Sequence, residues 1–559
     1  MEILESRRLT GPNLLLQDRE GAILDVVFNP GEDEAVLAAW ERHARRLLDA
    51  VGWPAETTAV RRFSGGASLA ISAPFDALYA ATDVNEQAWE AALAEINEIS
   101  GRPGPHPGET AARLRETIAR ESNPALRALR DTAEAQGVAF FTGEELATVG
   151  LGQGSLTFPT DAVPDPASID WSQVHDVPVV LVTGTNGKST TVRLLASIVR
   201  AAGLTAGTTS TDRVEVGDEV VDRGDFSGPS GARTLLRDRR VEVAILETAR
   251  GGILRRGLAV RRADVALVTN IAEDHLGDYG VQDLDSLAQA KLVVTRAIGA
   301  GGRVVLNADD PLLTARAGGL AVPITWFSLD PERVAGGDAA FLEGDELVLQ
   351  QGGQRLRIVR VQDVPIAFGG AARYNIANAL AAIAVAAALD LPAAAIADGL
   401  RQFRPTPEEN PGRANLLEIG GVRILLDYAH NPHGLAALLD LAATLPASRR
   451  LIVLGQAGDR DEAAIRTLAR TAWTFRPDRV VIKEIPTMLR GRAPGEIPAL
   501  LEDELRRQGA PPGSLERAED DLEAARQALA WARPGDLLVL LIHTQRDEVL
   551  DLLRRLRDG

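Results

Sequence analysis

Apolar and polar positions follow two different periods along this chain, and together they predict alternating strands and helices. Short apolar runs flanked by glycine, proline or acidic residues recur from residue 178 to residue 542, and most are followed by a stretch whose apolar residues repeat with a helical period. Alternation of this kind is typical of parallel sheets covered by helices. We therefore expect an α/β fold in the central and C-terminal parts.

Residues 1–165 show a different pattern. Extended runs at 22–28 and 67–72 alternate with amphipathic helical patterns at 34–48, 86–96 and 109–120. This mixture predicts a small α+β domain. Because it carries no phosphate loop, metal-type cluster or nucleophile motif, we expect it to bind a partner or to assemble a homo-oligomer. Residues 159–177 contain three prolines and no clear period, which predicts a linker.

The composition is that of a globular protein with several domains. The chain has 559 residues, of which 45% are hydrophobic and 25% charged. No apolar run reaches the roughly 18 to 20 residues that cross a bilayer, and the N-terminus lacks the apolar core of a signal peptide, so we expect a cytoplasmic protein. The net charge of −18 argues against general binding to nucleic acid or membranes, and the absence of cysteine excludes disulfides.

The clearest chemical signal is the segment 177–191, VPVVLVTGTNGKSTT. An apolar strand leads into a glycine-rich loop that opens a helix, an arrangement that directs backbone N–H groups at phosphate oxygens. Gly184 and Gly187 permit close backbone approach, Lys188 can reach the terminal phosphates, and the Ser189 hydroxyl can ligate magnesium. Val182 stands where the common phosphate-loop pattern has its first glycine, so this is a shortened variant.

Two further polar residues follow the ends of predicted parallel strands. Glu247 ends the apolar run 241–246, and His275 follows the strand 264–270. Ligands in such sheets bind at the carboxyl ends of the strands, beside the phosphate loop. Glu247 is therefore a candidate ligand for magnesium, and His275 is a candidate ligand for a second cation, although isolated histidines are more often structural.

Lysine is rare in this chain, so each lysine is a candidate for a chemical role. Of 60 basic residues only three are lysine, namely Lys188, Lys291 and Lys483. A lysine can lose its proton or react with carbon dioxide, which an arginine cannot readily do. Lys291 lies in a predicted helix at 284–296. Its ammonium would repel two nearby cations, whereas its carbamate would be an anion able to bridge them.

Other segments add candidate binding groups. A loop with a small hairpin at 217–218 is expected within residues 205–236, and Asn375 and Asn378 share one face of an alanine-rich helix, where they can meet an adenine edge. Capping of that helix by Asn375 is a compatible alternative. Arginines cluster at 237–240 and 255–262, either as a guide for a polyanion or, more commonly in an arginine-rich chain, as a solvated face.

The C-terminal part alternates strands at 422–426, 451–454, 479–482 and 537–542 with helical stretches. Polar clusters follow each strand and should border one cleft. No glycine fingerprint for a dinucleotide accompanies them, so we expect this Rossmann-like domain to close over a substrate.

Taken in order, these motifs resemble those of the Mur ligases, a family of ATP-dependent amide-forming enzymes. The resemblance rests on TGTNGKST, the strand ending in Glu247, NIAEDHLG, Lys291, LNADDP, RYNIAN, PGR at 411–413 and DYAHNP at 427–432. GDFSGPSGAR, LETARGGILRRGL, NPGRANLLE and LRGRAPGE (489–496) are most similar to the ligase module of the cyanophycin synthetases, and the opening RRLTGPN and the segment 120–154 resemble their N-terminal domain. The resemblance implies an N-terminal α+β domain (1–165), a central P-loop ATPase domain (166–407) and a C-terminal Rossmann-like domain (408–559).

The sequence departs from that subfamily in one respect that matters. Its members carry an ATP-grasp domain, which lengthens the aspartate backbone, between their N-terminal domain and the ligase module. Here only roughly 22 residues separate Gly154 from Val177, too few for a domain. Backbone extension is therefore expected to be absent. Tyr374 also replaces a histidine that is common before the adenine-binding asparagine.

The resemblance assigns roles to individual residues, with ATP and Mg²⁺ as the implied cofactors. Lys188, Lys291, His275 and Glu247 would be catalytic, and Ser189, Glu247 and His275 would bind the metal ions, with Lys291 carbamylated. The residues expected to contact the nucleotide are Thr185, Asn186, Gly187, Lys188, Ser189, Thr190, Asn375, Asn378, Arg413 and Asp427.

Three hypotheses about function remain. The first is an ATP-dependent ligase that joins a free amino acid, arginine or another basic one, to side-chain carboxylates of an acidic peptide or polymer through an acyl phosphate. The second keeps that mechanism but uses a muropeptide or folate-like acceptor. The third is an inactive scaffold that binds polymer, which predicts eroded catalytic positions, whereas Lys188, Ser189, Glu247, His275 and Lys291 are all present.

Overall fold

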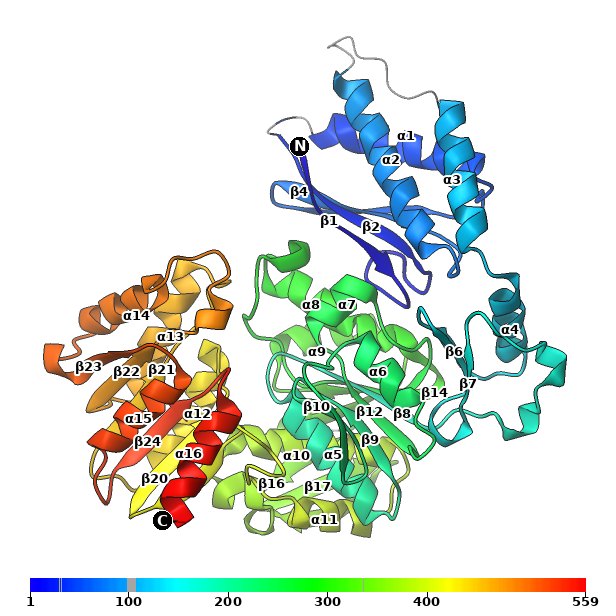
Figure 1. The fold of residues 1–559 in the computed structure, drawn as a ribbon. Coiled ribbons are helices and arrows are strands. Elements are labelled where there is room, and N and C mark those ends of the chain that lie inside the picture. The colour runs from blue at the N-terminus through cyan, green and yellow to red at the C-terminus, as the bar shows by residue number, and fades with distance from the viewer. Residues whose placement is uncertain (30, 32, 98–106, 335, 559) are drawn as a thin grey trace.

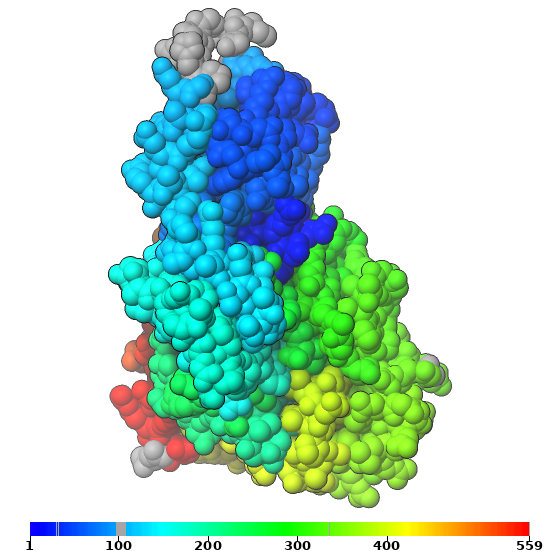
Figure 2. Space-filling model, turned by 90° about the vertical axis from the view of Figure 1, so that its right-hand side faces the viewer, coloured from blue at the N-terminus to red at the C-terminus, as the bar shows by residue number. Residues whose placement is uncertain are grey.

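The computed structural model describes the chain except for residues 30, 32, 98–106, 335 and 559. Three parts follow one another along the chain (Figure 1), and the N-terminal part stacks on the central part in the side view of Figure 2. None of the described helices is long and apolar enough to cross a membrane.

The N-terminal part is an antiparallel sheet covered on one face by helices. Its strand order is β1–β2–β4–β3. The elements are β1 (Glu2–Leu9), β2 (Gly21–Val27), α1 (Asp33–Ala50), β3 (Thr58–Phe63), β4 (Gly66–Ser72), α2 (Leu78–Asn97) and α3 (Pro107–Glu121). Trp40 and Trp89 are almost fully buried between sheet and helices. The predicted α+β mixture is thus present here.

A second, smaller sheet connects this part to the centre. It consists of β5 (Phe140–Thr142), β6 (Leu146–Val149) and β7 (Leu156–Pro159), with α4 (Pro124–Ala135) packed beside it. Between Gly154 and Val177 the chain forms only β7 and two single turns of 3-10 helix, at Pro166–Ser168 and Trp171–Gln173. No domain is inserted within this described segment, as the short spacing predicts.

The central sheet has eleven strands. The strand that leads into the phosphate loop lies inside the sheet and is parallel to the strands on both sides of it. The order is β11–β10–β9–β12–β8–β13–β14–β15–β16–β17–β18. The bounds are β8 (Val179–Thr183), β9 (Ala206–Thr209), β10 (Arg213–Val216), β11 (Glu219–Arg223), β12 (Val243–Glu247), β13 (Ala263–Val268), β14 (Ile298–Asn307), β15 (Ile324–Ser328), β16 (Ala339–Glu343), β17 (Glu346–Gln351) and β18 (Gln354–Arg360). β8 pairs in parallel with β12 and β13, and β10 and β11 form the predicted hairpin.

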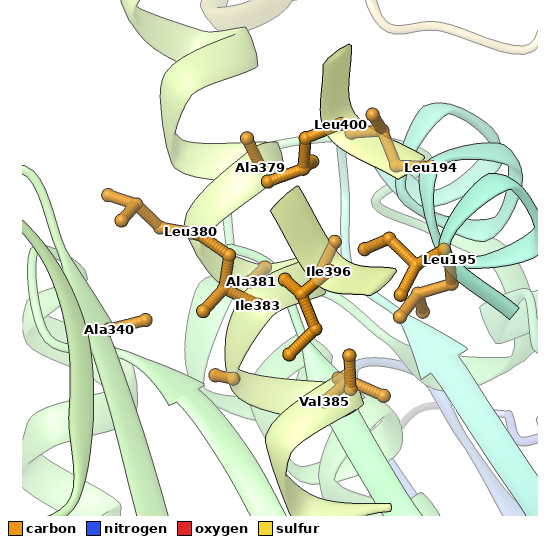
Figure 3. Close-up of a cluster of buried hydrophobic side chains, with 14 of the residues drawn as sticks. Leu194, Leu195, Ala340, Ala379, Leu380, Ala381, Ile383, Val385, Ile396 and Leu400 are labelled. Atoms are coloured by element: carbon orange, nitrogen blue, oxygen red, sulfur yellow. The ribbon is translucent and has the colours of Figure 1, made fainter. Parts of the chain in front are cut away.

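Helices cover both faces of this sheet. They are α5 (Lys188–Ala201), α6 (Pro229–Leu236), α7 (Arg250–Arg256), α8 (Leu284–Leu292), α9 (Pro311–Ala317), α10 (Arg373–Ala388) and α11 (Ala393–Gln402). Figure 3 shows α10 in the core, with Ala379 and Leu380 on the same helix as Ile383 and with leucines of α5 and α11 beside it. Small alanine side chains let these three helices approach closely.

The C-terminal part is a second α/β layer with strand order β19–β20–β24–β21–β22–β23. Its elements are β19 (Asn415–Ile419), β20 (Val422–Asp427), α12 (Pro432–Thr444), β21 (Arg450–Leu454), α13 (Glu462–Thr474), β22 (Arg479–Lys483), α14 (Glu496–Arg507), β23 (Leu515–Ala518), α15 (Asp521–Trp531), β24 (Leu537–Leu541) and α16 (Arg546–Asp558). The four strands expected from the sequence are all present. β19 pairs antiparallel with β20, and the remaining pairings in this sheet are parallel.

Two local expectations need correction. The helix expected at 284–296 ends at Leu292 and continues as a 3-10 turn, Val293–Ala297. Asn375 does not cap α10, because Ala372 occupies the N-cap position and the Asn375 amide donates to the Ile366 carbonyl at 3.0 Å.

Candidate active site

The phosphate loop takes a shape that only glycine permits at two positions. Gly184 has φ of 143° and Gly187 has φ of 88°, both in the region that side chains disfavour. A Cβ atom on Gly184 would lie 1.8 Å from the Thr269 hydroxyl oxygen, and one on Gly187 would lie 2.3 Å from Oδ1 of Asn378. The backbone therefore approaches its neighbours closely at both glycines.

Hydrogen bonds from the neighbouring strand fix the loop. The amides of Thr185 and Asn186 donate to the carbonyl and side-chain oxygens of Asn270, at 2.9 and 3.0 Å. Nζ of Lys188 donates to the Thr185 carbonyl at 3.0 Å. No side chain caps α5, whose N-cap is Gly187, so the helix presents free N–H groups and its positive dipole end, as an anion requires.

Loop residues and strand ends meet in one cavity of about 1220 Å³. Residues of the N-terminal part, such as Phe63, line it together with residues of the other two parts. All of the site residues predicted from the sequence line it: Thr185, Asn186, Gly187, Lys188, Ser189, Thr190, Glu247, His275, Lys291, Asn375, Asn378, Arg413 and Asp427. The structure therefore brings these residues together, while their individual roles remain predictions.

Glu247 is buried at the end of β12 without a partner. Its side chain is 2% exposed, and neither carboxylate oxygen has a hydrogen-bond partner among the described residues. An unpaired buried carboxylate is costly, and a bound cation would remove that cost. Ser189 lines the same cavity and offers a hydroxyl oxygen. This donor set fits a hard divalent cation such as magnesium.

Lys291 lies in the last turn of α8 and is 5% exposed. Its Nζ donates to the carbonyl of Gly184, in the phosphate loop, at 2.7 Å. Burial lowers the pKa of Lys291 well below its usual value, and the Lys188 charge lowers it further, while Asp274 opposes both effects. The neutral amine form of Lys291 is therefore more populated than that of an ordinary lysine.

His275 lies in a network that crosses between the central and C-terminal parts. Its Nδ1 lies 2.9 Å from a guanidinium nitrogen of Arg460 and 3.4 Å from a carboxylate oxygen of Asp459, and Arg460 also donates to Asp274 at 2.9 Å. Burial alone would lower the pKa of His275, but hydrogen bonds with Asp278 and Asp459 outweigh it, so the pKa is raised. Sequence analysis identified His275 but not its partners on the C-terminal side.

Ligand atoms converge around this histidine in two sets. Asp274, His275 and His430 form one set, and His275, Asp278 and Asp459 form the other, with the atoms of each set within 4.8 Å of one another. Imidazole and carboxylate groups are suitable ligands for a second cation.

The two asparagines that were predicted to contact adenine are hydrogen-bonded to each other. Nδ2 of Asn378 donates to Oδ1 of Asn375 at 3.1 Å, so the two asparagines do share a face of α10. The adjoining Tyr374 hydroxyl is buried without a described hydrogen-bond partner. Burial raises the pKa of Tyr374 well above its usual value, and the Asp427 charge adds to that rise.

Arg413 and Asp427 belong to the C-terminal part and form one wall of the main cavity. Asp427 accepts the amides of Ala414 and Ala429, each at 2.7 Å, and the Arg413 guanidinium lies 4.7 Å from the centre of the Tyr428 ring. Burial raises the pKa of Asp427, and Arg413 partly opposes that rise.

Direct hydrogen bonds hold the C-terminal part against the phosphate loop. The side chains of Asn186 and Asn431 exchange two hydrogen bonds, at 3.0 and 3.2 Å. Asp212 accepts from Arg193 and from Arg546, each at 2.5 Å. The C-terminal part thus lies directly against the phosphate-loop part, and the residue pairs that join them are ones that sequence patterns did not reveal.

Comparison with known families agrees with this geometry. Residues 182–386 match the Mur ligase middle domain, and residues 412–541 match the Mur ligase glutamate ligase domain. These two domains include the phosphate loop and the cavity wall formed by Arg413 and Asp427. Over them, the chain belongs to the Mur ligase family.

Individual relatives show which proteins of known name the chain resembles. The cyanophycin synthetase of Synechocystis is 38% identical over 372 residues, which cover 65% of this chain and 42% of that protein. The chain therefore spans less than half the length of that relative. The UDP-N-acetylmuramyl-tripeptide synthetase of Deinococcus radiodurans is 29% identical over 73% of this chain and 82% of that protein.

Among solved structures, MurF from Acinetobacter baumannii has a TM-score of 0.49 and 20% identity, over 68% of this chain and 77% of that one.

Proposed function

We propose that this protein is an ATP-dependent ligase that activates a carboxylate as an acyl phosphate and captures it with an amino group. The observation that carries the proposal is the convergence, in one cavity, of an uncapped phosphate loop, the unpartnered Glu247 carboxylate and the buried amine of Lys291. Membership of the Mur ligase family over residues 182–386 and 412–541 supports it.

In this mechanism the phosphate loop holds ATP, with Lys188 and the α5 N-terminus neutralising its terminal phosphates. An acceptor carboxylate oxygen attacks the γ-phosphorus, and the bond to the bridging oxygen of ADP breaks. An amine nitrogen then attacks the acyl carbon, loses a proton, and inorganic phosphate leaves. Divalent cations held by Ser189, Glu247 and His275 would supply neutralisation of phosphate charge.

We further propose that Lys291 acts as a carbamate. Its lowered pKa makes the neutral amine available, and this is the form that reacts with carbon dioxide. Conversion to an anion would also relieve the repulsion between Lys291 and Lys188, since both lie at the phosphate loop.

For the substrates, we propose a free basic amino acid and side-chain carboxylates of an aspartate-rich peptide or polymer. The likeness to a cyanophycin synthetase supports this choice. Asp225 also lines the cavity without an arginine or lysine partner among the described residues, so its carboxylate suits a cationic side chain.

The decisive experiment incubates the purified protein with ATP, magnesium, poly-L-aspartate and one amino acid at a time. We expect ADP release and a mass gain of the polymer with arginine or another basic amino acid, and neither without the polymer. Absence of both with every basic amino acid would remove the substrate assignment. ADP release with a UDP-linked muropeptide or a folate acceptor instead would favour the second class of acceptor, in line with the muramyl-tripeptide relative.

A further inference from the structure

The loop that follows β13 and carries His275 has an unusual backbone. His275 and Tyr279 have φ of 50° and 51°, in the left-handed region that side chains disfavour, and Gly277 and Gly280 also have positive φ. A backbone of this kind persists only when its surroundings hold it in place. The contacts that hold this loop therefore decide where the His275 side chain lies.

The central part holds the loop at its His275 end. The guanidinium of Arg250, the first residue of α7, donates to the His275 carbonyl at 2.5 Å and to the Asp278 carboxylate at 2.9 Å. Arginine can make both bonds at once because its planar group carries several N–H donors. The carbonyls of Tyr279 and Gly280, further along the loop, are bound from another part of the chain.

The N-terminal part holds this second half of the loop. Arg61, on β3, donates to the carbonyls of Tyr279 and Gly280, each at 2.9 Å. Hydrogen bonds from a charged donor are stronger than neutral ones. The amide of Ser64, in the turn after β3, donates to Oε1 of Gln282 at 2.8 Å. The β3–β4 hairpin thus binds the loop through its backbone as well as through a side chain.

Close packing leaves this end of the loop little room to shift. A Cβ atom on Gly280 would lie 2.6 Å from the Phe63 ring, and Phe63 lines the main cavity. The guanidinium of Arg7, on β1, lies 5.0 Å from the centre of the Tyr279 ring. Arg7 is itself fixed by a hydrogen bond of 2.5 Å to Asp25, on β2. The N-terminal sheet therefore contacts the loop through β1 as well as β3.

We propose that Arg61 is a positioning residue of the ligase, which holds the loop 275–282 so that His275 stays among the proposed cation ligands. The inference rests on the proposed function, because the second cation belongs to the proposed reaction. Arg61 does not line the main cavity, so it acts through the loop. The N-terminal part thereby takes part in assembling the active site of the central part.

Hydrogen–deuterium exchange of the full chain, followed by mass spectrometry, measures the order of the loop without any ligand. Inside the loop, the amides of Gly277 and Val281 donate to the carbonyls of Val281 and Asp278, at 2.7 and 3.0 Å. Their exchange therefore reports whether the loop keeps this backbone conformation.

Two arginine variants make the comparison. Arg61→Gln removes both guanidinium bonds to the loop. Arg296→Gln is the matched control: Arg296, in the 3-10 turn after α8, donates to the backbone carbonyl of Asn13 across the same boundary between the N-terminal and central parts, and it does not line the main cavity. We expect Arg61→Gln to speed exchange of the peptide 276–282 about tenfold, and Arg296→Gln to change it by less than about twofold. Unchanged exchange in β2 and β4 verifies that both variants keep the fold.

The second readout is the binding of Mn²⁺, a paramagnetic substitute for the proposed cations. Free Mn²⁺ is counted by electron paramagnetic resonance while the full chain is titrated in the presence of ADP. His275→Ala is the reference for loss of the cation ligand. We expect Arg61→Gln to raise the Kd of the more weakly bound Mn²⁺ about tenfold, toward the value for His275→Ala, and Arg296→Gln to stay within about twofold of wild type.

Three results would overturn the proposal. The first is wild-type exchange of the loop in Arg61→Gln. The second is equal acceleration in Arg61→Gln and Arg296→Gln, because the effect would then be a general loosening of the boundary. The third is faster exchange with unchanged Mn²⁺ binding, since the loop would then be held for a reason other than the cation.

The two proposals can fail separately. If Arg61→Gln loosens the loop and weakens Mn²⁺ binding, but the wild type releases no ADP with any acceptor, the positioning role stands and the ligase assignment fails. If the wild type modifies its acceptor, but Arg61→Gln keeps wild-type exchange and Mn²⁺ binding, the ligase assignment stands and the positioning role fails.

Discussion

At the scale of single residues, Glu247 exposes a conflict between stability and function. A buried carboxylate without a partner destabilises the protein unless a cation binds it. The unpaired carboxylate of Glu247 is therefore expected if the cavity holds a cation, as proposed above.

Glu247→Gln removes the charge and keeps the shape. We expect the free energy of unfolding of the metal-free protein to rise by about 1 kcal/mol or more, because a buried charge is lost. Magnesium-dependent ADP release should fall at least roughly a hundredfold. Chemical denaturation without metal and a coupled ADP assay measure the two effects. A variant that is both less stable and fully active would contradict this account of Glu247.

Lys291→Arg tests the carbamate, since arginine keeps a long basic side chain and cannot be carbamylated. We expect kcat to fall by about a hundredfold or more, with the fold retained by circular dichroism. In the wild type, ¹³C-bicarbonate should give a carbamate signal by NMR that the variant lacks.

Lys483→Arg makes the same change at a lysine outside the main cavity, and because Lys483 is fully buried its fold is checked by circular dichroism before the turnover of the two variants is compared. Near-normal turnover of Lys291→Arg in bicarbonate-free buffer would count against the carbamate.

At the scale of elements, the interior of the C-terminal sheet holds a buried ion pair. Lys483, at the end of β22, donates to Asp521 at the start of α15, and the two residues are 0% and 1% exposed. Asp521 also accepts the amide and hydroxyl of Thr544, at 2.7 and 2.8 Å. His543 links this pair to the active-site loop, because its Nε2 lies 3.3 Å from the Ala429 carbonyl.

Asp521→Asn should cost about 3 to 5 kcal/mol at pH 7, because it leaves Lys483 buried without its counter-ion. Burial would raise the pKa of Asp521, but Lys483 and His543 outweigh it and hold the pKa below its usual range, so the stabilisation is present above about pH 4 and is lost on further acidification. The gap in unfolding free energy between wild type and variant should therefore narrow below about pH 4. Denaturation curves across that range provide the measurement.

Asp551→Asn on α16 is the control for Asp521→Asn. Its side chain is 58% exposed, so the same substitution should change stability by less than about 0.5 kcal/mol. A loss for Asp521→Asn as small as that of the control would show that the buried pair contributes little.

The sequence predicted the elements that depend on local patterns. β8 was recognisable because an uninterrupted apolar run leads into glycines, and Glu247 could be placed because carboxyl ends of parallel strands converge at one edge. β18 was missed: Leu356 and its neighbours are largely exposed, so the strand lacks a clear apolar alternation. Partners that lie far apart in the chain, such as Asp212 and Arg546, leave no local pattern at all.

At the scale of the whole molecule, closure joins the phosphate loop to the C-terminal part. Asp212 accepts a hydrogen bond from Arg193, on the helix that follows the loop, and another from Arg546, at the start of α16. Closure excludes water, which would otherwise hydrolyse an acyl phosphate.

Arg546→Gln should weaken closure without touching the loop itself. We expect a larger radius of gyration by small-angle X-ray scattering, and more ADP released per amide bond formed, by roughly two- to tenfold, because water reaches the intermediate. Arg555→Gln, on the exposed side of the same helix, should change neither quantity. Tight coupling in Arg546→Gln would mean that this contact does not govern closure.

The distribution of lysines has a practical consequence. Lys291 and Lys483 are 5% and 0% exposed, which leaves Lys188 in the phosphate loop as the most accessible lysine side chain. Amine-directed reagents would therefore modify Lys188 before the other two lysines. A single labelling reaction, read by mass spectrometry with and without a bound nucleotide, would report the occupancy of the loop without any engineered tag.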